Sequence, residues 1–507
     1  MNEKYLVGID SGTQSTRVII FNTRGEQICS GIGKHPPLIA EKQGWAEHGE
    51  MDVWIGLCEA ARSAFSKFRG KLTDVVGIGL ASQRGTIMAV DEKNRLIQRP
   101  ISWMDSRMAY GIEPMPDDTD PRYKFLRFYS KANWLRINKP GVFEKTYKYL
   151  TVGGFLGHKL TAGYVDTVCN QYGGWPVDSK EWCVTDEPWI CECVGIRLDQ
   201  MSKLVMPGSI IGHITEEGAE ETGFPAGCPV MASAGDKQCE VLGAGAIKEG
   251  QTYITLGTST TLAFVSNEWK TAPDLSFLTY MSCIPKTYNY EAPLARGFWL
   301  VSWFRDNLGM DLDAEAKKQG VSIETLLNRE ARNIPPGSEG LVVIPDWQAP
   351  RSRPYGKGMI IGFDDRHTRA HMFRALIEGI LLQLKFNTDV MCKQIGREVT
   401  ELRVGGGGSR SKMVLQAVAD IFDVPAIGAS VVETCSLGAA ICAAVGAGVY
   451  PSFEAAVDAM TAKKDCFYPV PENRELYRGI REKVIAKAYS TFEPILKELS
   501  EMTGQKS

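Results

Sequence analysis

The sequence lacks the long apolar runs, the basic blocks and the paired cysteines that mark several specialised classes of protein. No stretch approaches the roughly 20 apolar residues that a helix needs to span a bilayer. Lys and Arg total 57 against 60 Asp and Glu, and they are spread along the chain. Nucleic acids and anionic membranes both require concentrated positive charge, so we expect neither as a main partner.

Cysteine and histidine occur without the spacing of a metal or redox site. The 13 cysteines are scattered, and the closest pair, Cys191 and Cys193, is too short for a CxxC motif. The six histidines form no HExxH pattern, and His367 and His371 are more typical of a helix start than of a metal site. Scattered thiols indicate a reducing compartment. The first residues read as a strand and not as the apolar core of a signal peptide, so we expect a cytoplasmic protein.

Two hairpins of one kind lie about half a chain apart in the 507 residues, a length that predicts two large domains. Residues 6–21 (LVGIDSGTQSTRVIIF) place a Gly-Thr turn at Gly12 between apolar strands, and residues 252–265 place another at Gly257. Such a turn exposes backbone amides and hydroxyls that can hold an anion. Two related halves with matching turns therefore predict a phosphate chain held between two lobes.

Two acidic residues lie at sequence positions where a reaction at a phosphate group would need a carboxylate. Asp10 ends the first strand beside the turn, where its carboxylate would repel a phosphate unless a divalent cation stood between them. We therefore predict that Asp10 is a magnesium ligand, direct or through water; the alternative is that it only caps the turn. Asp236 follows Gly235 and precedes a small-residue helix, whose N-terminus favours the ionised form that a general base needs.

A third glycine-rich turn lies in the second half. A strand at residues 401–404 runs into four glycines, Gly405 to Gly408, and a helix follows at residues 413–422. A strand–glycine–helix junction lets a ligand approach the backbone closely and presents amide groups at a helix N-terminus. Glycine runs also occur as plain loops, and this one gains weight because it is the third such turn.

Two segments of the first half combine polar and aromatic side chains. Gln83 and Arg84 follow an apolar strand, where an open α/β sheet usually places ligand contacts. Trp103 and Asp105 add an aromatic plate and an acid, with a base two residues further on. This set suits a polyhydroxylated molecule, because rings stack on C–H faces while charged forks bind hydroxyls. The alternative for the second segment is a turn with a surface ion pair.

Apolar residues recur with the helical period in several segments of the chain. This pattern predicts helices at residues 50–68, 145–160, 297–308, 368–392 and 413–422. Residues 110–140 are rich in Pro, Asp and aromatic side chains and lack such periodicity, so we expect an irregular insertion there.

The ordered set of motifs resembles the FGGY family of carbohydrate kinases, within the actin–hexokinase–Hsp70 ATPase superfamily. The first hairpin resembles the family's phosphate-1 motif, and ITLGTSTT (254–261) resembles phosphate-2. Residues 402–422 are similar to the adenosine motif, and residues 436–448 to the second connecting helix. Residues 358–378 come close to the C-terminal signature, and GDKQ at 235–238 occupies the place of the catalytic Gly-Asp.

This resemblance implies an α/β protein with two ribonuclease H-like lobes, which we place at residues 1–245 and 246–507, and an ATP cleft between them. It also implies phosphorylation of a hydroxyl on a small sugar or polyol, dependent on ATP and Mg²⁺. Asp236 would be the catalytic base, and Asp10 and Asp236 would lie at the metal. The residues implied to bind ATP are Gly12, Thr13, Gln14, Ser15, Arg17, Gly257, Thr258, Gly406, Gly407 and Gly408. The resemblance implies acceptor contacts at Arg84, Trp103 and Asp236, and the positions and charges of the residues themselves add Gln83, Asp105 and Lys237 to the predicted acceptor site.

Some residues depart from the family's pattern. Glycerol kinases carry Glu where this chain has Gly85, and the Met-His pair of xylulokinases is missing. Phe298, Trp299 and Leu300 are bulky where many relatives present small residues toward the nucleotide. Lys237 beside the predicted base is also unusual. Its ammonium group could bind an acceptor that carries a carboxylate, or it could form a salt bridge with a surface acid.

Three alternatives remain beside a kinase of a neutral sugar or polyol of about three to six carbons. One is a kinase of an acidic sugar derivative. The others are an ATP-gated binding module and a pseudokinase of the same superfamily. The acceptor set around Arg84 and Trp103 argues against the binding module, and the presence of both Asp10 and Asp236 argues against the pseudokinase. The sequence leaves the assembly open, with a homodimer as one form.

Overall fold

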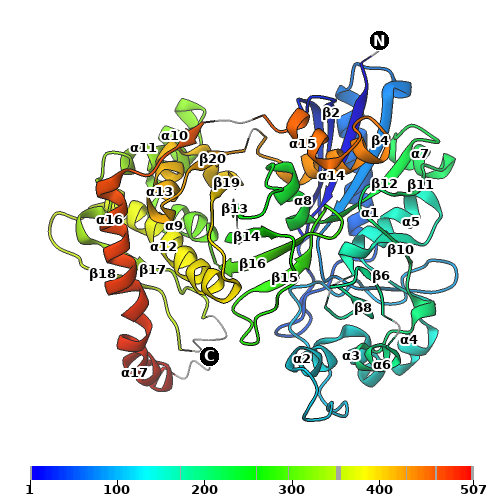
Figure 1. Ribbon diagram of the computed structural model, residues 1–507, viewed down its shortest axis with the longest axis horizontal. Helices are drawn as coiled ribbons and strands as arrows, with labels where there is room; N and C mark the ends of the chain where they lie inside the picture. The colour runs from blue at the N-terminus through cyan, green and yellow to red at the C-terminus, as the bar shows by residue number, and fades with distance from the viewer. Residues whose placement is uncertain are drawn as a thin grey trace.

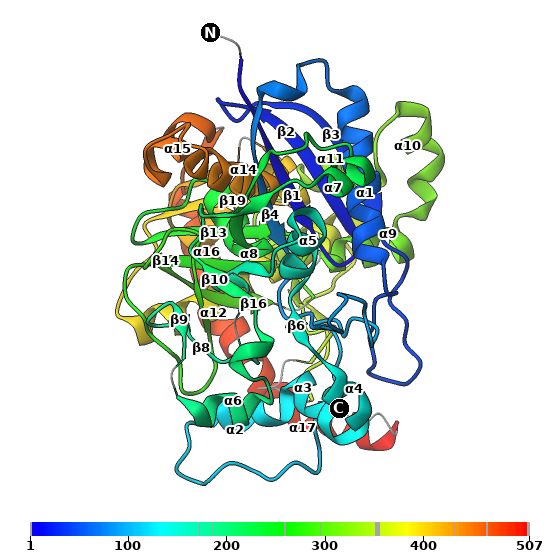
Figure 2. The ribbon, with the colours of Figure 1, turned by 90° about the vertical axis from the view of Figure 1, so that its right-hand side faces the viewer.

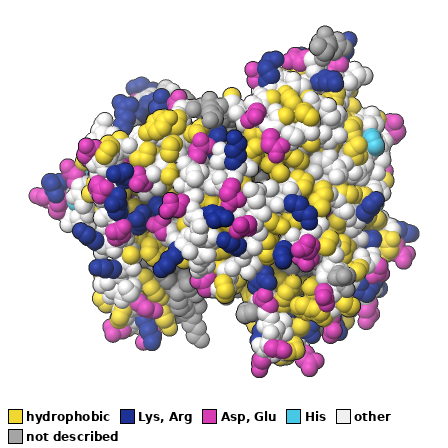
Figure 3. All heavy atoms as spheres, in the orientation of Figure 1, with side chains coloured by type: hydrophobic (Ala, Val, Ile, Leu, Met, Phe, Trp, Pro, Cys, Tyr) yellow, Lys and Arg dark blue, Asp and Glu magenta, His cyan; other side chains and the backbone are white. Residues whose placement is uncertain are grey.

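The computed structural model describes residues 3–171, 173–185, 187–257, 260–294, 296–349, 355–429, 431–462 and 465–503. Two large β-sheets organise the chain, one in each of two lobes, which lie to the right and left of Figure 1. Among the described residues, none of the helices has both the length and the apolar character to cross a membrane. On the face shown in Figure 3, positively and negatively charged side chains are interspersed.

The first sheet has the strand order β11-β12-β4-β1-β2-β3. Strands β1, β2 and β3 form an antiparallel meander, β4 lies parallel to β1, and β12 lies parallel to β4. Their bounds are β1 (Tyr5–Ser11), β2 (Ser15–Asn22), β3 (Gln27–Lys34), β4 (Val75–Ser82), β11 (Ile210–His213) and β12 (Pro229–Gly235).

The second sheet repeats this plan in the order β15-β16-β14-β13-β19-β20-β21. Strands β13, β14 and β16 form the matching antiparallel set, with β15 between β14 and β16 in the sequence, while β19 lies parallel to β13 and β20 lies parallel to β19. The bounds are β13 (Gln251–Leu256), β14 (Thr260–Ser266), β15 (Leu278–Met281), β16 (Tyr288–Leu294), β19 (Glu401–Gly405), β20 (Ala426–Gly428) and β21 (Cys466–Phe467). Two lobes of the same topology confirm the predicted α/β fold.

Helices cover both faces of the first sheet, which explains why its central strands are apolar throughout. Helix α1 (Asp52–Lys67) packs on β2 and β3, while α14 (Thr434–Gly446) packs on β1 and β4. Helix α14 also crosses α8 (Asp236–Gly243), and both lie between the lobes in Figure 1. A domain boundary at residues 245/246 stays a prediction, and α14 contacts the first sheet although it lies beyond that boundary in the sequence.

Glycines allow this central packing to bring backbone against backbone. A Cβ atom added to Gly8 would lie 1.8 Å from the Ser436 carbonyl oxygen, and one on Gly79 would lie 1.9 Å from that of Ala439. Between the helices, a Cβ on Gly438 would lie 2.0 Å from the Cys239 carbonyl oxygen. Real Cβ atoms do not approach so closely, so each of these positions requires glycine.

Short helices form a layer at the foot of the first lobe, as both views show (Figures 1 and 2). They are α2 (Pro121–Tyr129), α3 (Lys131–Asn138), α4 (Pro140–Lys145) and α6 (Pro188–Val194). The expectation of an irregular insertion at residues 110–140 was therefore wrong over most of its length. The missed signals were helix starts: Asp120 caps α2 just before a proline, and Ser130 caps α3.

The second lobe places its longest helix, α12 (Arg369–Ile395), against β14, β16 and β17. Its other helices are α9 (Trp299–Leu308), α10 (Asp313–Gln319), α11 (Ile323–Ala331), α13 (Lys412–Phe422), α16 (Pro471–Ile480) and α17 (Ala486–Met502). The remaining helices pack on the first lobe: α5 (Val152–Thr161), α7 (Glu216–Thr222) and α15 (Phe453–Met460). The remaining strands are β5 (Met88–Val90), β6 (Lys148–Leu150), β7 (Val165–Thr167), β8 (Val177–Asp178), β9 (Cys183–Val184), β10 (Lys203–Val205), β17 (Val342–Ile344) and β18 (Met359–Ile361).

Candidate active site

Three strands of the first sheet end in register and so bring the predicted site residues to one edge. Ser11, the last residue of β1, pairs with Ser82 at the end of β4, and Ser82 pairs with Gly235 at the end of β12. The residues that follow these strands therefore leave the sheet side by side. The carboxyl edge of parallel strands is where open α/β sheets bind ligands.

Hydrogen bonds join the first hairpin turn to two of the predicted acceptor residues. The Thr13 hydroxyl donates to Gln83 Oε1 at 3.0 Å and accepts from Trp103 Nε1 at 2.9 Å. Gln83 is only 3% exposed, whereas Trp103 is 46% exposed. Gln83 therefore orients the turn from behind, and Trp103 keeps an open ring surface beside it. The predicted direct contact of Gln83 with a substrate is not supported by this buried position.

A pair of histidines stands behind the same turn. His35 Nδ1 donates to the Thr13 carbonyl at 3.2 Å, and His48 Nε2 lies 3.2 Å from Gln83 Nε2. Burial lowers the pKa of both imidazoles, that of His48 to about 4, so both are neutral at pH 7. Neither histidine could be predicted to support the turn, because no metal or nucleophile motif includes either residue.

The two predicted acids come together from different elements. Asp10 lies near the end of β1, and Asp236 is the first residue of α8. Burial raises the pKa of Asp10 to about 7, and the negative charge of Asp236 adds to this rise. Arg17, which pairs with Asp10 across the hairpin, lies 4.0 Å from its Oδ2 and 3.3 Å from Glu433 Oε2. The structure thus places two carboxylates at one edge, with a single arginine beside the more buried one.

Arg84 reaches Asp236 but binds more closely to the other lobe. Its Nε lies 3.7 Å from Asp236 Oδ1, while its two terminal nitrogens donate to the two oxygens of Glu291 at 2.9 and 3.0 Å. Its guanidinium carbon also lies 4.0 Å from the centre of the Tyr280 ring. Sequence reasoning missed Glu291 and Tyr280, which lie on the β15–β16 hairpin of the second sheet.

Lys237 is bound by an acid of its own helix. Its Nζ lies 2.6 Å from Glu240 Oε1, one helical turn along α8. This is the salt bridge that the sequence left open as an alternative, although the acid is mostly buried and not on the surface. The paired ammonium group gives no support to the hypothesis that Lys237 binds an acceptor carboxylate.

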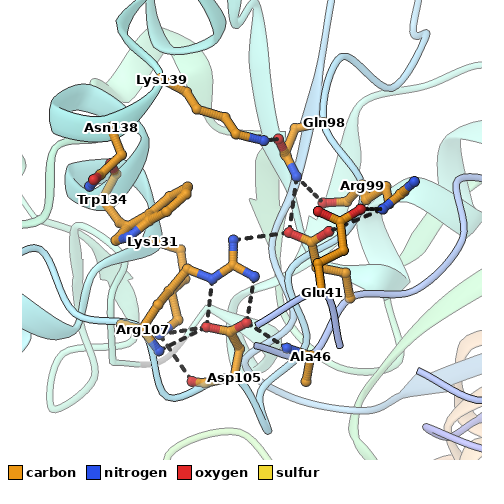
Figure 4. A network of polar contacts seen from close by, with 11 residues as sticks. Glu41, Ala46, Gln98, Arg99, Asp105, Arg107, Lys131, Trp134, Asn138 and Lys139 are labelled. Carbon is orange, nitrogen blue, oxygen red and sulfur yellow. Dashed lines mark hydrogen bonds and ion pairs between the residues drawn. The ribbon is translucent and has the colours of Figure 1, made fainter. Parts of the chain in front are cut away.

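The Asp105 side chain lies in a buried polar network (Figure 4). Its carboxylate accepts two hydrogen bonds from Arg107, at 2.8 and 2.7 Å, and one from the Ala46 amide at 2.7 Å. Its side chain is 0% exposed, and Arg107 also binds Glu47 at 2.9 Å. The prediction that Asp105 contacts substrate is therefore corrected: the ion pair of the alternative forms, but it is internal and holds a loop in place.

The second lobe presents its two glycine turns next to each other. Strand β13 ends just before Gly257 and runs beside β19, which leads into the four-glycine turn. The Gly257 carbonyl accepts from the Phe298 amide at 3.1 Å. Thr258, predicted to bind phosphate, lies outside the described residues. In the first turn, Gly12 donates to the Ser15 carbonyl at 3.0 Å, and Gln14 is exposed.

The four glycines serve different purposes. A Cβ atom on Gly406, which has φ of +79°, would lie 2.9 Å from the Leu256 backbone, and one on Gly408 would lie 2.5 Å from the Phe298 ring. These two positions need glycine for internal packing, and Phe298 fills the space beneath the turn. A Cβ on Gly407 would meet nothing within 4 Å. Packing does not explain this glycine, which faces open space.

Comparison with known proteins decides the family. The N-terminal domain of the FGGY family of carbohydrate kinases matches residues 5–243, and its C-terminal domain matches residues 252–447. The chain belongs to this family. This FGGY kinase is a phosphotransferase that acts on an alcohol group of a sugar or polyol.

Relatives of this FGGY kinase match it over nearly its whole length. It is 34% identical to an uncharacterized sugar kinase, YgcE, of Escherichia coli, covering 99% of this chain and 96% of the relative. It is 27% identical to a xylulose kinase of Bacillus subtilis, covering 94% and 95%. A gluconate kinase structure from Lactobacillus acidophilus shares the fold, with a TM-score of 0.81 at 21% identity over 97% of this chain and 100% of that one.

The acids of this FGGY kinase fit a magnesium ion that is held mainly by other ligands. Within the part of the chain that the structure describes, no three His, Cys, Asp or Glu side chains are grouped as a metal site. Mg²⁺ commonly uses one or two carboxylates and takes its other ligands from water and phosphate. Burial first, and then the negative charge of Asp236, raises the pKa of Asp10, and a cation beside the two carboxylates would favour the ionised form of Asp10.

Proposed function

We propose that this FGGY kinase transfers the terminal phosphate of ATP to a hydroxyl of an uncharged sugar or polyol, with Asp236 as the general base. The observation that carries the proposal is the meeting of Asp10 and Asp236 at the sheet edge where the Thr13 turn also lies. A carboxylate that can hold Mg²⁺ beside a phosphate turn and a second that can accept the hydroxyl proton are two of the recurring parts of a phosphoryl-transfer site.

The protein's part in the reaction is mainly positioning. The turns at Gly12 and Gly257, one from each lobe, would hold the phosphates in line with the acceptor. Asp236 would accept the hydroxyl proton as the acceptor oxygen attacks. Asp10 and Asp236 would hold Mg²⁺, which supplies neutralisation of phosphate charge. Closure of the lobes would exclude water, which otherwise competes with the acceptor.

The acceptor would lie between Arg84 and the exposed ring of Trp103. The indole offers a flat apolar face for C–H groups, and the Trp103 nitrogen is already bound to the first turn, which fixes the ring. Arg84 stands 3.7 Å from Asp236, so a hydroxyl held by the guanidinium would be within reach of the base. A small polyol or ketose has the size and the hydroxyl density that this arrangement serves.

A screen of ATP consumption against ketoses, aldoses, polyols and sugar acids tests the proposal. We expect acceptor-dependent ADP release with at least one neutral compound, abolished by EDTA and restored by Mg²⁺. The same assay on the Asp236→Asn variant is the control for contaminating kinases. ADP release that is independent of every acceptor, or equal in the variant, would contradict the proposed function.

Gly407, which faces open space, leads to a separate prediction about where the nucleotide binds. We propose that adenosine lies against Gly406–Gly408, with Gly407 facing it. Replacing Gly407 with Leu would fill this space without disturbing the packing beneath, so we expect ATP affinity to fall by about tenfold or more at an unchanged melting temperature. Calorimetric titration with ATP measures the effect.

The matched control is Gly479→Leu in α16, since a Cβ there also meets nothing within 4 Å. That variant should bind ATP as the native protein does. Unchanged ATP affinity in Gly407→Leu would show that the nucleotide does not lie against this turn.

A further inference from the structure

In the proposed acceptor region, the positive charge of Arg84 is paired with a carboxylate of the opposite lobe. Two parallel hydrogen bonds to Glu291, at 2.9 and 3.0 Å, form the fork geometry that is the strongest arrangement for an arginine and a carboxylate. The Tyr280 ring stacks against the same guanidinium at 4.0 Å. The side chains of Arg84 and Glu291 are 13% and 6% exposed, so water screens the pair little.

The other cations near the base are matched in the same way. Lys237 binds Glu240, and Arg17 lies between Glu433 and Asp10. Carboxylates outnumber cations in this group of ion pairs. The carboxylates are Asp10, Asp236, Glu240, Glu291 and Glu433, and the cations are Arg17, Arg84 and Lys237. The proposed Mg²⁺ would offset Asp10 and Asp236, and the other three carboxylates equal the three cations in number, so an anionic acceptor would meet no excess of positive charge from these side chains.

We propose that Glu291 is a specificity-determining residue that restricts the acceptor to uncharged sugars and polyols. It acts through Arg84: while Glu291 occupies the two terminal nitrogens, the guanidinium can still orient a hydroxyl, but it cannot neutralise a second carboxylate. The carboxylate of a sugar acid would either have to displace Glu291 from Arg84 or lie close to the negative charge of Glu291, and both are unfavourable. This inference rests on the proposed function, and it names the substrate class of the same site.

The position of Glu291 on the sheet explains why this residue can act on Arg84 directly. Glu291 pairs with Leu278 across the β15–β16 hairpin, and Tyr280 pairs with Asn289 two residues before Glu291. Alternate residues of a strand share one face, so Glu291 and Tyr280 both lie on the face that meets Arg84 of the first lobe. The contact joins residues 207 positions apart, and it forms only where the two lobes meet.

The test compares neutral acceptors with aldonates of the same carbon number. For the native protein we expect kcat/KM on the best polyol or ketose to exceed that on the matching aldonate by about a hundredfold or more. Glu291→Gln keeps the shape but removes the negative charge at the two terminal nitrogens of Arg84, which leaves Asp236, at 3.7 Å from Nε, as the carboxylate paired with it. We expect it to lose about tenfold on neutral acceptors and to gain on aldonates, so that the ratio falls by at least about thirtyfold. Glu291→Asp should restore much of the native ratio.

A buried Arg–Glu pair away from Arg84 serves as the control. Glu378 accepts from Arg374 Nε at 2.7 Å within α12, and Glu378→Gln should lower stability without changing the acceptor ratio. Calorimetric affinities for a polyol and its aldonate, measured without nucleotide, give a readout that does not need turnover. If the native protein turns over no acceptor, the proposed function fails, and these affinities still decide the inference. Equal neutral-to-acid preference in native protein and Glu291→Gln, by either readout, would overturn it.

Discussion

Replacing Asp236 with Asn should lower the turnover number by at least about a hundredfold while ATP still binds almost normally. The amide keeps the size of the side chain and much of its hydrogen bonding, but it cannot take a proton from the acceptor. General-base assistance is worth roughly 10²–10⁴-fold, and the turns that position the phosphates are untouched by the change. Turnover at saturating acceptor and ATP affinity by calorimetry measure the two parts separately.

Asp10→Asn is the contrasting variant. It removes the acid whose pKa burial raises to about 7, beside the phosphate turn, and leaves the base in place. We expect a higher Mg²⁺ requirement rather than a simple loss of turnover. A near-native turnover number for Asp236→Asn would remove Asp236 from the mechanism, whatever the behaviour of Asp10→Asn.

Replacing Asp105 with Asn should destabilise the protein by about 3 kcal/mol or more and leave catalysis in the folded fraction nearly unchanged. The change removes one of the two buried carboxylates that bind Arg107 and leaves it with Glu47, so part of the charge balance of this buried network is lost. Thermal unfolding measures the loss, and kcat/KM at a temperature well below the transition should stay within about threefold of the native value. A large rise in KM with native stability would instead return Asp105 to the acceptor site.

The chain offers a closely matched control for this change. Asp120 and Arg122 form an ion pair with the same two-residue spacing, at 2.6 Å, but both side chains are about 40% exposed. Exposed ion pairs contribute little to the free energy of unfolding, and Asn caps a helix as well as Asp does. Asp120→Asn should therefore shift stability by less than about 1 kcal/mol. A similar loss in both variants would show that burial is not what makes the Asp105 network important.

The parts of this protein that could be predicted from sequence are those in which a short segment defines its own geometry. The Gly12 hairpin, the four-glycine turn and the acid after Gly235 each combine a strand with its turn or helix. The structure places each of them at the carboxyl end of a strand in one of the two large sheets. Two related hairpins likewise predicted two lobes of one topology. Their roles in binding and catalysis stay predictions until they are measured.

The residues that were missed or misread owe their roles to contacts over long distances in the sequence. Glu291 meets Arg84 across 207 positions, and the partners of Gln83 at Thr13 and His48 come from two other segments. Asp105 was misread because its neighbours in the sequence look like a surface turn. In the structure, the Ala46 amide donates to Asp105 and Glu47 binds its partner Arg107, and both come from a distant loop. The local sequence pattern does not show whether a distant segment of the chain will pack over a given side chain.

Helix α14 also has a consequence for the order in which the protein can be completed. It covers β1 and β4, the first and fourth strands to be made, but it is encoded near the other end of the chain and packs on them with no clearance at Gly8 and Gly79. During synthesis the central face of the first sheet must therefore remain uncovered until residue 446 has left the ribosome. Nascent chains that stop before this helix should be the ones that chaperones retain and proteases remove.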